Sequence, residues 1–183
     1  KTAGYQTACI GKWHLGHAHR RLLPNARGFD HFYGHVNADI HYFTHLHMGG
    51  LDWQRNGKSV EEEGYSTNLL ANEACDWIRK RDKSRPFFLY LPFIEPHVAM
   101  HPPKELVDSY PEAWDDRPYR GQCGYLPHPR PRAAYAAMIT HLDQHVGAVL
   151  KTLDELKLTD NTIVLFSSDN GTTNASPGDD VFG

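Results

Sequence analysis

The sequence predicts an α/β fold in which a mostly parallel sheet carries helices on both faces. Two continuous apolar runs have the length of strands, at 86–97 and 161–168, and two longer segments repeat apolar residues at helical spacing, at 66–81 and 135–153. Strands and helices that alternate in this way form parallel sheets with right-handed crossovers. The length of 183 residues corresponds to about one domain.

The first element expected is a short strand over Tyr5 to Ile10, which leads into a glycine-containing turn. From about Leu23 to Gly64 the chain is rich in proline, glycine and aromatic residues and has no clear period. We expect this stretch to form loops over the scaffold, and such loops commonly decide which substrate a site accepts.

A helix is expected next. Ser66 or Thr67 can cap its start, and the basic run 79–81 suits its carboxyl end. Its apolar positions are Leu70, Ala74, Trp77 and Ile78.

The run PFFLYLPFIEPH, from Pro86 to His97, is apolar throughout and bounded by prolines. This pattern is typical of a strand that is covered on both faces in the middle of a sheet.

The last two elements follow a proline-rich loop that extends to about Arg132. A long amphipathic helix is expected over 135–153, and a second buried strand over Asn161 to Ser168. That strand leads directly into Asp169, Asn170 and Gly171.

Composition excludes several classes of protein. The 22 acidic and 19 basic residues are interspersed and give a net charge of −3, so a nucleic-acid partner is not expected. No apolar run approaches the length of a membrane span, which indicates a soluble globular chain. Thirteen histidines would make the net charge positive in acid. The spacing of Cys9, Cys75 and Cys123 indicates neither a disulfide framework nor a zinc site.

Polar clusters stand at three expected strand ends, where ligands bind in α/β sheets. Lys12 and His14 alternate on an extended chain, so both point to one side and could hold an anion, while Trp13 packs on the other side. The alternative is a surface lysine beside a structural histidine. His97 follows Pro96 after the apolar run, beside Glu95, and suits a general acid, although a loop histidine is more often structural.

The third cluster, Asp169-Asn170, offers two hard oxygens to Ca²⁺ or Mg²⁺, with Gly171 permitting a tight turn. An ordinary Asx turn is the alternative interpretation. Asn170 and Asn174 also begin glycosylation sequons, but an asparagine that binds a metal cannot carry a glycan.

Other chemistry-bearing residues are interpreted as structural. His41, His45 and His47 could form a metal cluster, but no carboxylate stands at matching spacing. His141 and His145 are one helical turn apart and are expected on a solvated face. Packing is expected for Trp13, Trp53, Trp77 and Trp114.

The stretch GYQTACIGKWHLG, residues 4–16, resembles the second signature of the formylglycine-dependent, type I sulfatases, G-Y-x-[ST]-x-x-[IV]-G-K-W-H-L-G. The resemblance covers essentially the whole chain and is strongest to arylsulfatase and arylsulfatase B-like sequences. It continues through RGFDHFYG (27–34), GYSTNLLANEA (64–74), RPFFLYLPFIEPH (85–97), YAAMITHLDQHVG (135–147) and DNTIVLFSSDNG (160–171).

The resemblance implies the alkaline-phosphatase-like fold and hydrolysis of a sulfate ester of a small molecule or a carbohydrate. Lys12 and His14 would hold the nucleophile and the sulfate, and His97 would contact the ester and assist the leaving oxygen. Asp169 and Asn170 would ligate Ca²⁺, with Mg²⁺ as the alternative. Proteins of this family are usually periplasmic, secreted or lysosomal, so the resemblance implies one of these locations.

The family's nucleophile is a formylglycine made from Cys or Ser in a C/S-x-P-x-R motif, and none of the three cysteines stands in such a motif. The paired aspartates that complete the family's metal site and a later lysine are also not in the sequence. We therefore expect residues 1–183 to be an internal segment of one sulfatase catalytic domain, inactive in isolation. A phosphatase or phosphodiesterase on the same fold and a non-catalytic module are the alternatives.

Overall fold

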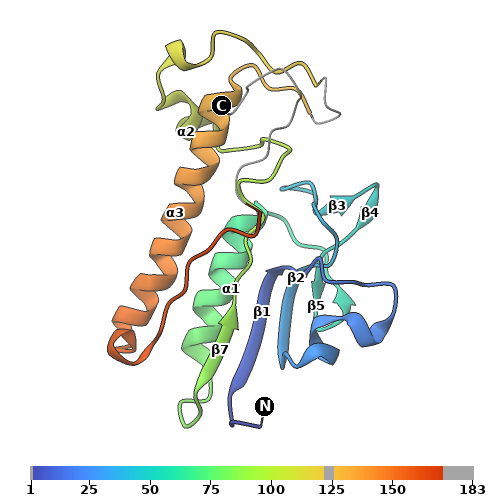
Figure 1. The fold of residues 1–183 in the computed structure, drawn as a ribbon, viewed down its shortest axis with the longest axis vertical. Coiled ribbons are helices and arrows are strands. Elements are labelled where there is room, and N and C mark those ends of the chain that lie inside the picture. The colour runs from blue at the N-terminus through green and yellow to red at the C-terminus, as the bar shows by residue number, and fades with distance from the viewer. Residues whose placement is uncertain (1, 122–125, 171–183) are drawn as a thin grey trace. The chain divides into compact units, whose positions relative to one another are not determined.

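The computed structural model describes residues 2–121 and 126–170, which divide into two compact units (Figure 1). The first unit comprises residues 1–94 and 145–156, and the second comprises residues 95–144 and 157–183. Cys123, Gly171 and the sequon at Asn174 lie outside the described residues.

Strands dominate the first unit. Its elements are β1 (Gln6–Lys12), η1 (Arg20–Leu22), η2 (Pro24–Arg27), β2 (His31–His35), β3 (Leu46–His47), β4 (Gly50–Leu51), β5 (Gln54–Arg55), β6 (Lys58–Ser59), α1 (Ser66–Lys80) and β7 (Phe87–Tyr90). The main sheet has five strands in the order β6-β5-β2-β1-β7, and β1 runs parallel to both of its neighbours. β5 and β6 add antiparallel pairs, and β3 pairs with β4 in a separate hairpin. The first strand and the mixed sheet are therefore confirmed, with two parallel and two antiparallel strand pairs.

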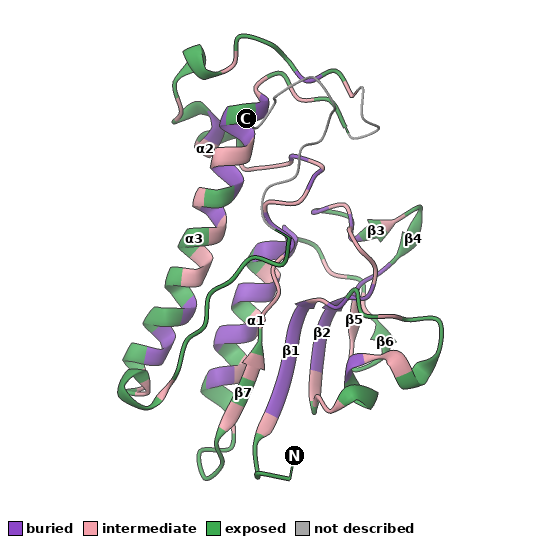
Figure 2. Cartoon of the chain, viewed as in Figure 1, coloured by how far each residue is buried: buried purple, intermediate pink, exposed green. Residues whose placement is uncertain are grey.

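The predicted helix is confirmed as α1, and it buries one side, including Leu70, Ala74 and Ile78 (Figure 2). Its start differs from the prediction. Tyr65 occupies the cap position, while the Ser66 and Thr67 hydroxyls are buried and make no hydrogen bond within the described ranges. The Ser66 amide instead donates to the Tyr42 carbonyl at 2.8 Å, so a loop carbonyl replaces the expected side-chain cap.

The opposite face of β1 and β7 is covered by the loop that contains η1 and η2. Trp13 and Phe29 pack edge to face with ring centroids 6.0 Å apart, and Phe29 stacks on Phe88 and Tyr90 of β7. Cys9 belongs to the same buried cluster as Trp13. In the first unit, a helix thus covers one face of the sheet and an aromatic loop covers the other.

The strand predicted over 86–97 is shorter than expected and lies at an edge. β7 ends at Tyr90, and Phe88 is 52% exposed, so the strand is not covered on both faces in the described residues. Pro92 and Pro96 lack the amide hydrogens that a central strand donates to its neighbours, which explains why the pairing stops.

The second unit contains α2 (Lys104–Asp108), η3 (Glu112–Trp114), η4 (Thr159–Asn161) and the first part of α3 (Pro131–Glu155), whose last turns belong to the first unit. The predicted long helix is confirmed. Asp115 accepts from the Arg132 and Ala133 amides and so caps the start of α3. None of the helices in the described ranges has both the length and the hydropathy that crossing a bilayer requires.

The buried strand predicted over Asn161 to Ser168 is not formed. The segment has no strand pairing among the described residues, and Ile163 and Leu165 are each 90% exposed. An apolar run becomes a strand only when another strand pairs with its backbone. The segment therefore has the apolar sequence of a buried strand but no neighbouring strand in the described residues to pair with.

Candidate functional site

The end of β1 is held tightly between two neighbouring segments. A Cβ atom on Gly11 would lie 2.1 Å from the Pro92 carbonyl oxygen, and one on Gly34 would lie 2.2 Å from the Gly11 carbonyl oxygen. Both glycines have positive φ, of 134° and 137°. The Lys12 amide donates to Pro92 at 2.8 Å. This close approach fixes the backbone from which Lys12 projects.

Lys12 and His14 both belong to the first unit, but the extended chain that the sequence predicts does not continue to His14. β1 ends at Lys12, and His14 has a left-handed backbone with φ of 46°. The Trp13 and His14 amides continue the bonding to β2 through His35 and Val36 carbonyls, at 2.9 and 3.3 Å. Strand alternation therefore does not apply at His14, and the turn's hydrogen bonds position it instead.

Lys12 places a positive charge at this strand end. Lys12 is half-buried, and its ammonium group makes no ion pair within the part of the chain that the structure describes. His14 is exposed, and Trp13 between them is buried and packed, as expected. A partly buried cation that makes no ion pair is suited to receive an anion.

Asp52 stabilises the end of β2, a role that no pattern in the sequence indicates. Its carboxylate is buried and accepts from the amides of Val36 and Asn37 and from the Asn37 side chain, at 2.8 to 3.2 Å. Because Val36 in turn accepts from His14, the Asp52 carboxylate supports the turn that carries the imidazole.

His35 is a second residue that the sequence did not single out. It pairs in register with Lys12 across β1 and β2 and is completely buried. Burial lowers the pKa of His35 to about 3, an effect that Asp52 opposes and that Lys12 reinforces. The imidazole is therefore neutral at physiological pH, so it adds no positive charge beside Lys12.

In the second unit, a buried pair anchors the segment that carries His97. His141 Nδ1 lies 3.0 Å from Glu95 Oε2, and both side chains are almost completely buried. The prediction of a solvated His141 is therefore wrong, because its partner is 46 residues away in the sequence. His97 is part-buried, and its Nδ1 lies 2.5 Å from the Val98 carbonyl oxygen.

Asp169 and Asn170 are exposed at the end of the second unit's described chain. A carboxylate and an amide are both hard oxygen donors, so the pair fits part of a Ca²⁺ shell, which takes six to eight oxygens. Within the described ranges, no group of three or more His, Cys, Asp or Glu residues is placed to hold a metal. The two residues therefore fit a partial site only.

The three loop histidines have structural roles. His41 Nδ1 accepts from the Phe43 and Thr44 amides, and His45 donates to the Gly64 carbonyl while stacking on Trp53 with centroids 4.5 Å apart. His47 Nδ1 lies 3.0 Å from Asp39 Oδ1. Each of these histidines therefore has its own contacts within the loop.

The remaining tryptophans differ in burial. Trp53 is fully buried and Trp77 packs against Phe87. Trp114 is 43% exposed, although its ring contacts Tyr110 with centroids 5.1 Å apart. Of the four tryptophans expected to pack, Trp114 is therefore the one with the largest exposed fraction.

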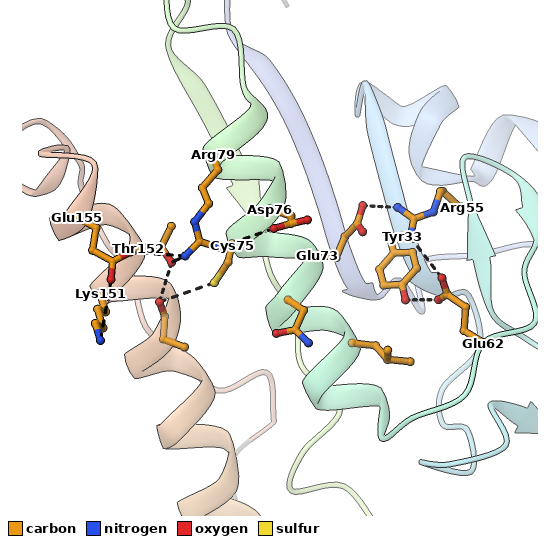
Figure 3. Close-up of a pocket in the computed structure, with 13 residues that line it drawn as sticks. Tyr33, Arg55, Glu62, Glu73, Cys75, Asp76, Arg79, Lys151, Thr152 and Glu155 are labelled. Carbon is orange, nitrogen blue, oxygen red and sulfur yellow. Dashed lines mark hydrogen bonds and ion pairs between the residues drawn. The ribbon is translucent and has the colours of Figure 1, made fainter.

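A cavity of about 490 Å³ opens in the first unit beside α1, and its charged groups already satisfy one another (Figure 3). Arg55 bonds Glu73, and the Tyr33 hydroxyl donates to Glu62. Burial and that hydrogen bond raise the pKa of Tyr33. The lining is completed by Leu69, Asn72, Cys75, Asp76, Arg79, Ala148, Lys151, Thr152 and Glu155. Such a self-paired lining is typical of a structural crevice.

Comparison with known proteins shows which family this chain resembles. The sequence profile of the family described as Sulfatase matches residues 1–178. An arylsulfatase of Clostridium perfringens is 34% identical over 92% of this chain and 44% of its own length. The human N-acetylgalactosamine-6-sulfatase is 29% identical over 93% of this chain and 31% of its own length. The chain thus spans less than half the length of these curated relatives.

Solved structures of similar fold point to the same family. The crystal structure of Ps i-CgsB in complex with k-i-k-neocarrahexaose has 28% identity and a TM-score of 0.73 over 87% of this chain and 36% of that one. A second structure, in complex with its substrate D-glucosamine-2-N,6-O-disulfate, shares 19% identity and a TM-score of 0.64, over 87% of this chain and 46% of that one, and so shares the fold. The α/β architecture is that of the alkaline-phosphatase-like sulfatase fold. On its profile match, the chain belongs to the sulfatase family.

Proposed function

We propose that this chain acts in the hydrolysis of carbohydrate sulfate esters. The observation that carries the proposal is the end of β1, where the half-buried Lys12 ammonium makes no ion pair among the described residues and stands two positions from an exposed imidazole. A sulfate oxyanion would balance this charge. The carbohydrate class is supported by the relative named N-acetylgalactosamine-6-sulfatase and by the k-i-k-neocarrahexaose ligand of a structural neighbour.

Each of the three proposed catalytic residues has a distinct part. Lys12 would neutralise charge on the sulfate oxygens, and His14 would donate a hydrogen bond to the same group. His97 donates its Nδ1 hydrogen to the Val98 carbonyl, and its Nε2 would deliver a proton to the leaving alcohol oxygen. The convergence of His97 with Lys12 and His14 is part of the proposal.

Asp169 and Asn170 would supply two oxygens to Ca²⁺, or to Mg²⁺, which would polarise the sulfate. Further oxygen ligands would come from residues outside the described ranges. A formylglycine hydrate, on a segment other than these 183 residues, would provide the nucleophile. On this proposal, residues 1–183 form part of a single catalytic domain of a periplasmic, secreted or lysosomal enzyme.

The test is the Lys12→Met variant of the full-length protein that contains these residues. Loss of one preorganised charge at a developing oxyanion lowers kcat by about 10²–10³-fold, and we expect that decrease in sulfate-ester hydrolysis. Lys58→Met, an exposed lysine of β6, is the control and should retain activity.

Two results would contradict the proposal. Faster turnover of phosphate esters than of matched sulfate esters would favour a phosphatase or phosphodiesterase on the same fold. No turnover of either ester by the full-length protein, with its C/S-x-P-x-R motif present, would favour a non-catalytic module.

A further inference from the structure

Charge is distributed unevenly along the chain. Residues 1–29 contain five of the 19 basic residues and none of the 22 acidic ones. Residues 17–27, which we call the basic segment, begin three positions after His14 and include Arg20, Arg21 and Arg27. A concentration of one sign of charge beside an anion site raises the local concentration of anionic ligands.

The basic segment is fixed to the end of β1 by Trp13. The Trp13 indole donates to the carbonyls of Gly16 and Leu22, at 3.1 and 3.0 Å. Leu22 is the last residue of η1, which contains both Arg20 and Arg21. The indole that separates Lys12 from His14 therefore also holds the turn that carries two arginines.

The same segment is anchored at two further points. His19 Nδ1 accepts from the Arg21 amide at 3.1 Å, and Leu23 packs against the buried cluster that contains Trp13. These contacts hold the backbone in one conformation, so a ligand need not order it.

The guanidinium groups of the basic segment are available to a ligand. Arg20, Arg21 and Arg27 are exposed, and none of their side chains has an ion pair or hydrogen bond within residues 2–121 and 126–170. The nearest acidic residue in the sequence, Asp30, is engaged by the Thr7 amide and hydroxyl at 3.1 and 3.3 Å. A guanidinium fork matches two oxygens of a sulfate group.

We infer that the basic segment binds a second sulfate group of the substrate, so that the preferred substrate is a multiply sulfated glycan rather than a monosulfated aryl ester. This inference rests on the proposed function, in which Lys12 and His14 hold the sulfate to be removed. Arg20 and Arg21 then bind a sulfate on the same glycan chain and leave the chemical step unchanged.

The experiment compares the full-length protein with its Arg20→Gln/Arg21→Gln variant. The probe is dextran sulfate, and uncharged dextran is the blank. We expect the dissociation constant for dextran sulfate to rise by about 10-fold or more, and the slope of log Kd against log salt concentration to fall by about one to two. Hydrolysis of para-nitrophenyl sulfate, which has a single sulfate group, should stay within about twofold of the unaltered protein because the arginines do not touch that sulfate.

The matched control is Lys80→Gln/Lys83→Gln. It removes two exposed positive charges, one on the last residue of α1 and one in the loop between α1 and β7 (Figure 1). Equal weakening of dextran sulfate binding by both double variants would overturn the inference, as would no weakening by the arginine variant. Single-stranded DNA that competes as well as dextran sulfate would also overturn it.

The design separates this inference from the proposed function. If the full-length protein hydrolyses no sulfate ester but the arginine variant selectively loses dextran sulfate, the proposed function fails and the polyanion site stands. If sulfatase activity is present and the arginine variant binds dextran sulfate normally, the inference fails and the proposed function stands.

Discussion

The end of β1 and the segment 161–170 have similar sequence patterns and different structures. Each is an apolar run that leads into two polar residues proposed to act on a sulfate group. The backbone at Lys12 is bonded to β2 and to Pro92, and glycines permit its closest approaches. The segment before Asp169 has no strand pairing among the described residues and exposes Ile163 and Leu165.

This difference shows that a functional strand end depends on its neighbours more than on its own sequence. The position of Lys12 follows from contacts that β2 and Pro92 make with Gly11 and Gly34. The segment 161–168 has equally strong apolar character but lacks such contacts in the described chain. Local pattern therefore identifies which residues can act, and pairing decides where they are placed.

The most damaging change to the β1 end should be Gly11→Ala. The new Cβ would meet the Pro92 carbonyl oxygen at 2.1 Å on a backbone with φ of 134°. Overpacking and backbone strain together should lower the free energy of unfolding by about 3–5 kcal/mol. Gly57→Ala is the control, because Gly57 has φ of 78° but no atom within 4 Å, and it should cost about 1–2 kcal/mol. Equal losses in urea unfolding would show that the close approach is not what fixes this strand end.

In the second unit, His141→Ala tests whether a buried pair replaces strand pairing as the anchor for His97. The change leaves the buried Glu95 carboxylate without its imidazole partner, and we expect a loss of about 3 kcal/mol in the free energy of unfolding. His145→Ala, one turn further along α3 and half-buried, should cost no more than about 1 kcal/mol. A result in which both variants lose the same amount would contradict the anchoring role.

The pH dependence of stability should report on His35, beside Lys12. Burial lowers its folded-state pKa to about 3, whereas an unfolded histidine has a pKa near 6.5. Protons therefore bind the unfolded chain first, and stability is lost as the pH falls below about 6.5. Between pH 6.5 and 5 this amounts to roughly 2 kcal/mol.

Replacing His35 with Phe should abolish that component of the pH dependence, measured by urea unfolding at several pH values. His17→Gln, at an exposed position of the basic segment, should leave it intact. An unchanged pH dependence in the His35 variant would mean that its imidazole takes up protons in the folded state.

The smallest effect should be on thiol chemistry. Cys9 is completely buried in β1, and burial raises the pKa of its thiol to about 12. At pH 8 the reactive thiolate is then on the order of one part in ten thousand. Iodoacetamide should leave Cys9 unmodified in the folded protein and modify it in urea, with mass spectrometry of the peptide as the measurement. Rapid labelling under native conditions would show that β1 opens.

The elements with strong internal periodicity could be predicted from the sequence. α1 and α3 follow from apolar residues at helical spacing, and β1 follows from an apolar run before a glycine, although the strand continues past that glycine to Lys12. The order of Pro96 and His97 after the apolar run can also be read directly from the sequence. The proposed roles of Lys12, His14, His97, Asp169 and Asn170 remain predictions.

The features that escaped prediction depend on residues far apart in the sequence. Glu95 and His141 are joined across 46 residues, and Asp52 acts on amides 15 and 16 residues before it. The early end of β7 and the unpaired segment 161–168 both reflect strand partners, which an apolar run does not encode. Hydrogen-bond partners of this kind become visible only when the chain is folded.

The left-handed backbone at His14 restricts how its imidazole can be removed without disturbing the turn. At φ of 46°, alanine or a β-branched residue would strain the peptide that follows Trp13, whereas asparagine adopts this conformation readily. An alanine variant would therefore combine a chemical loss with a conformational one. Asparagine is the replacement that isolates the chemistry of the side chain, and glycine would add freedom that Lys12 and the basic segment do not have in the native protein.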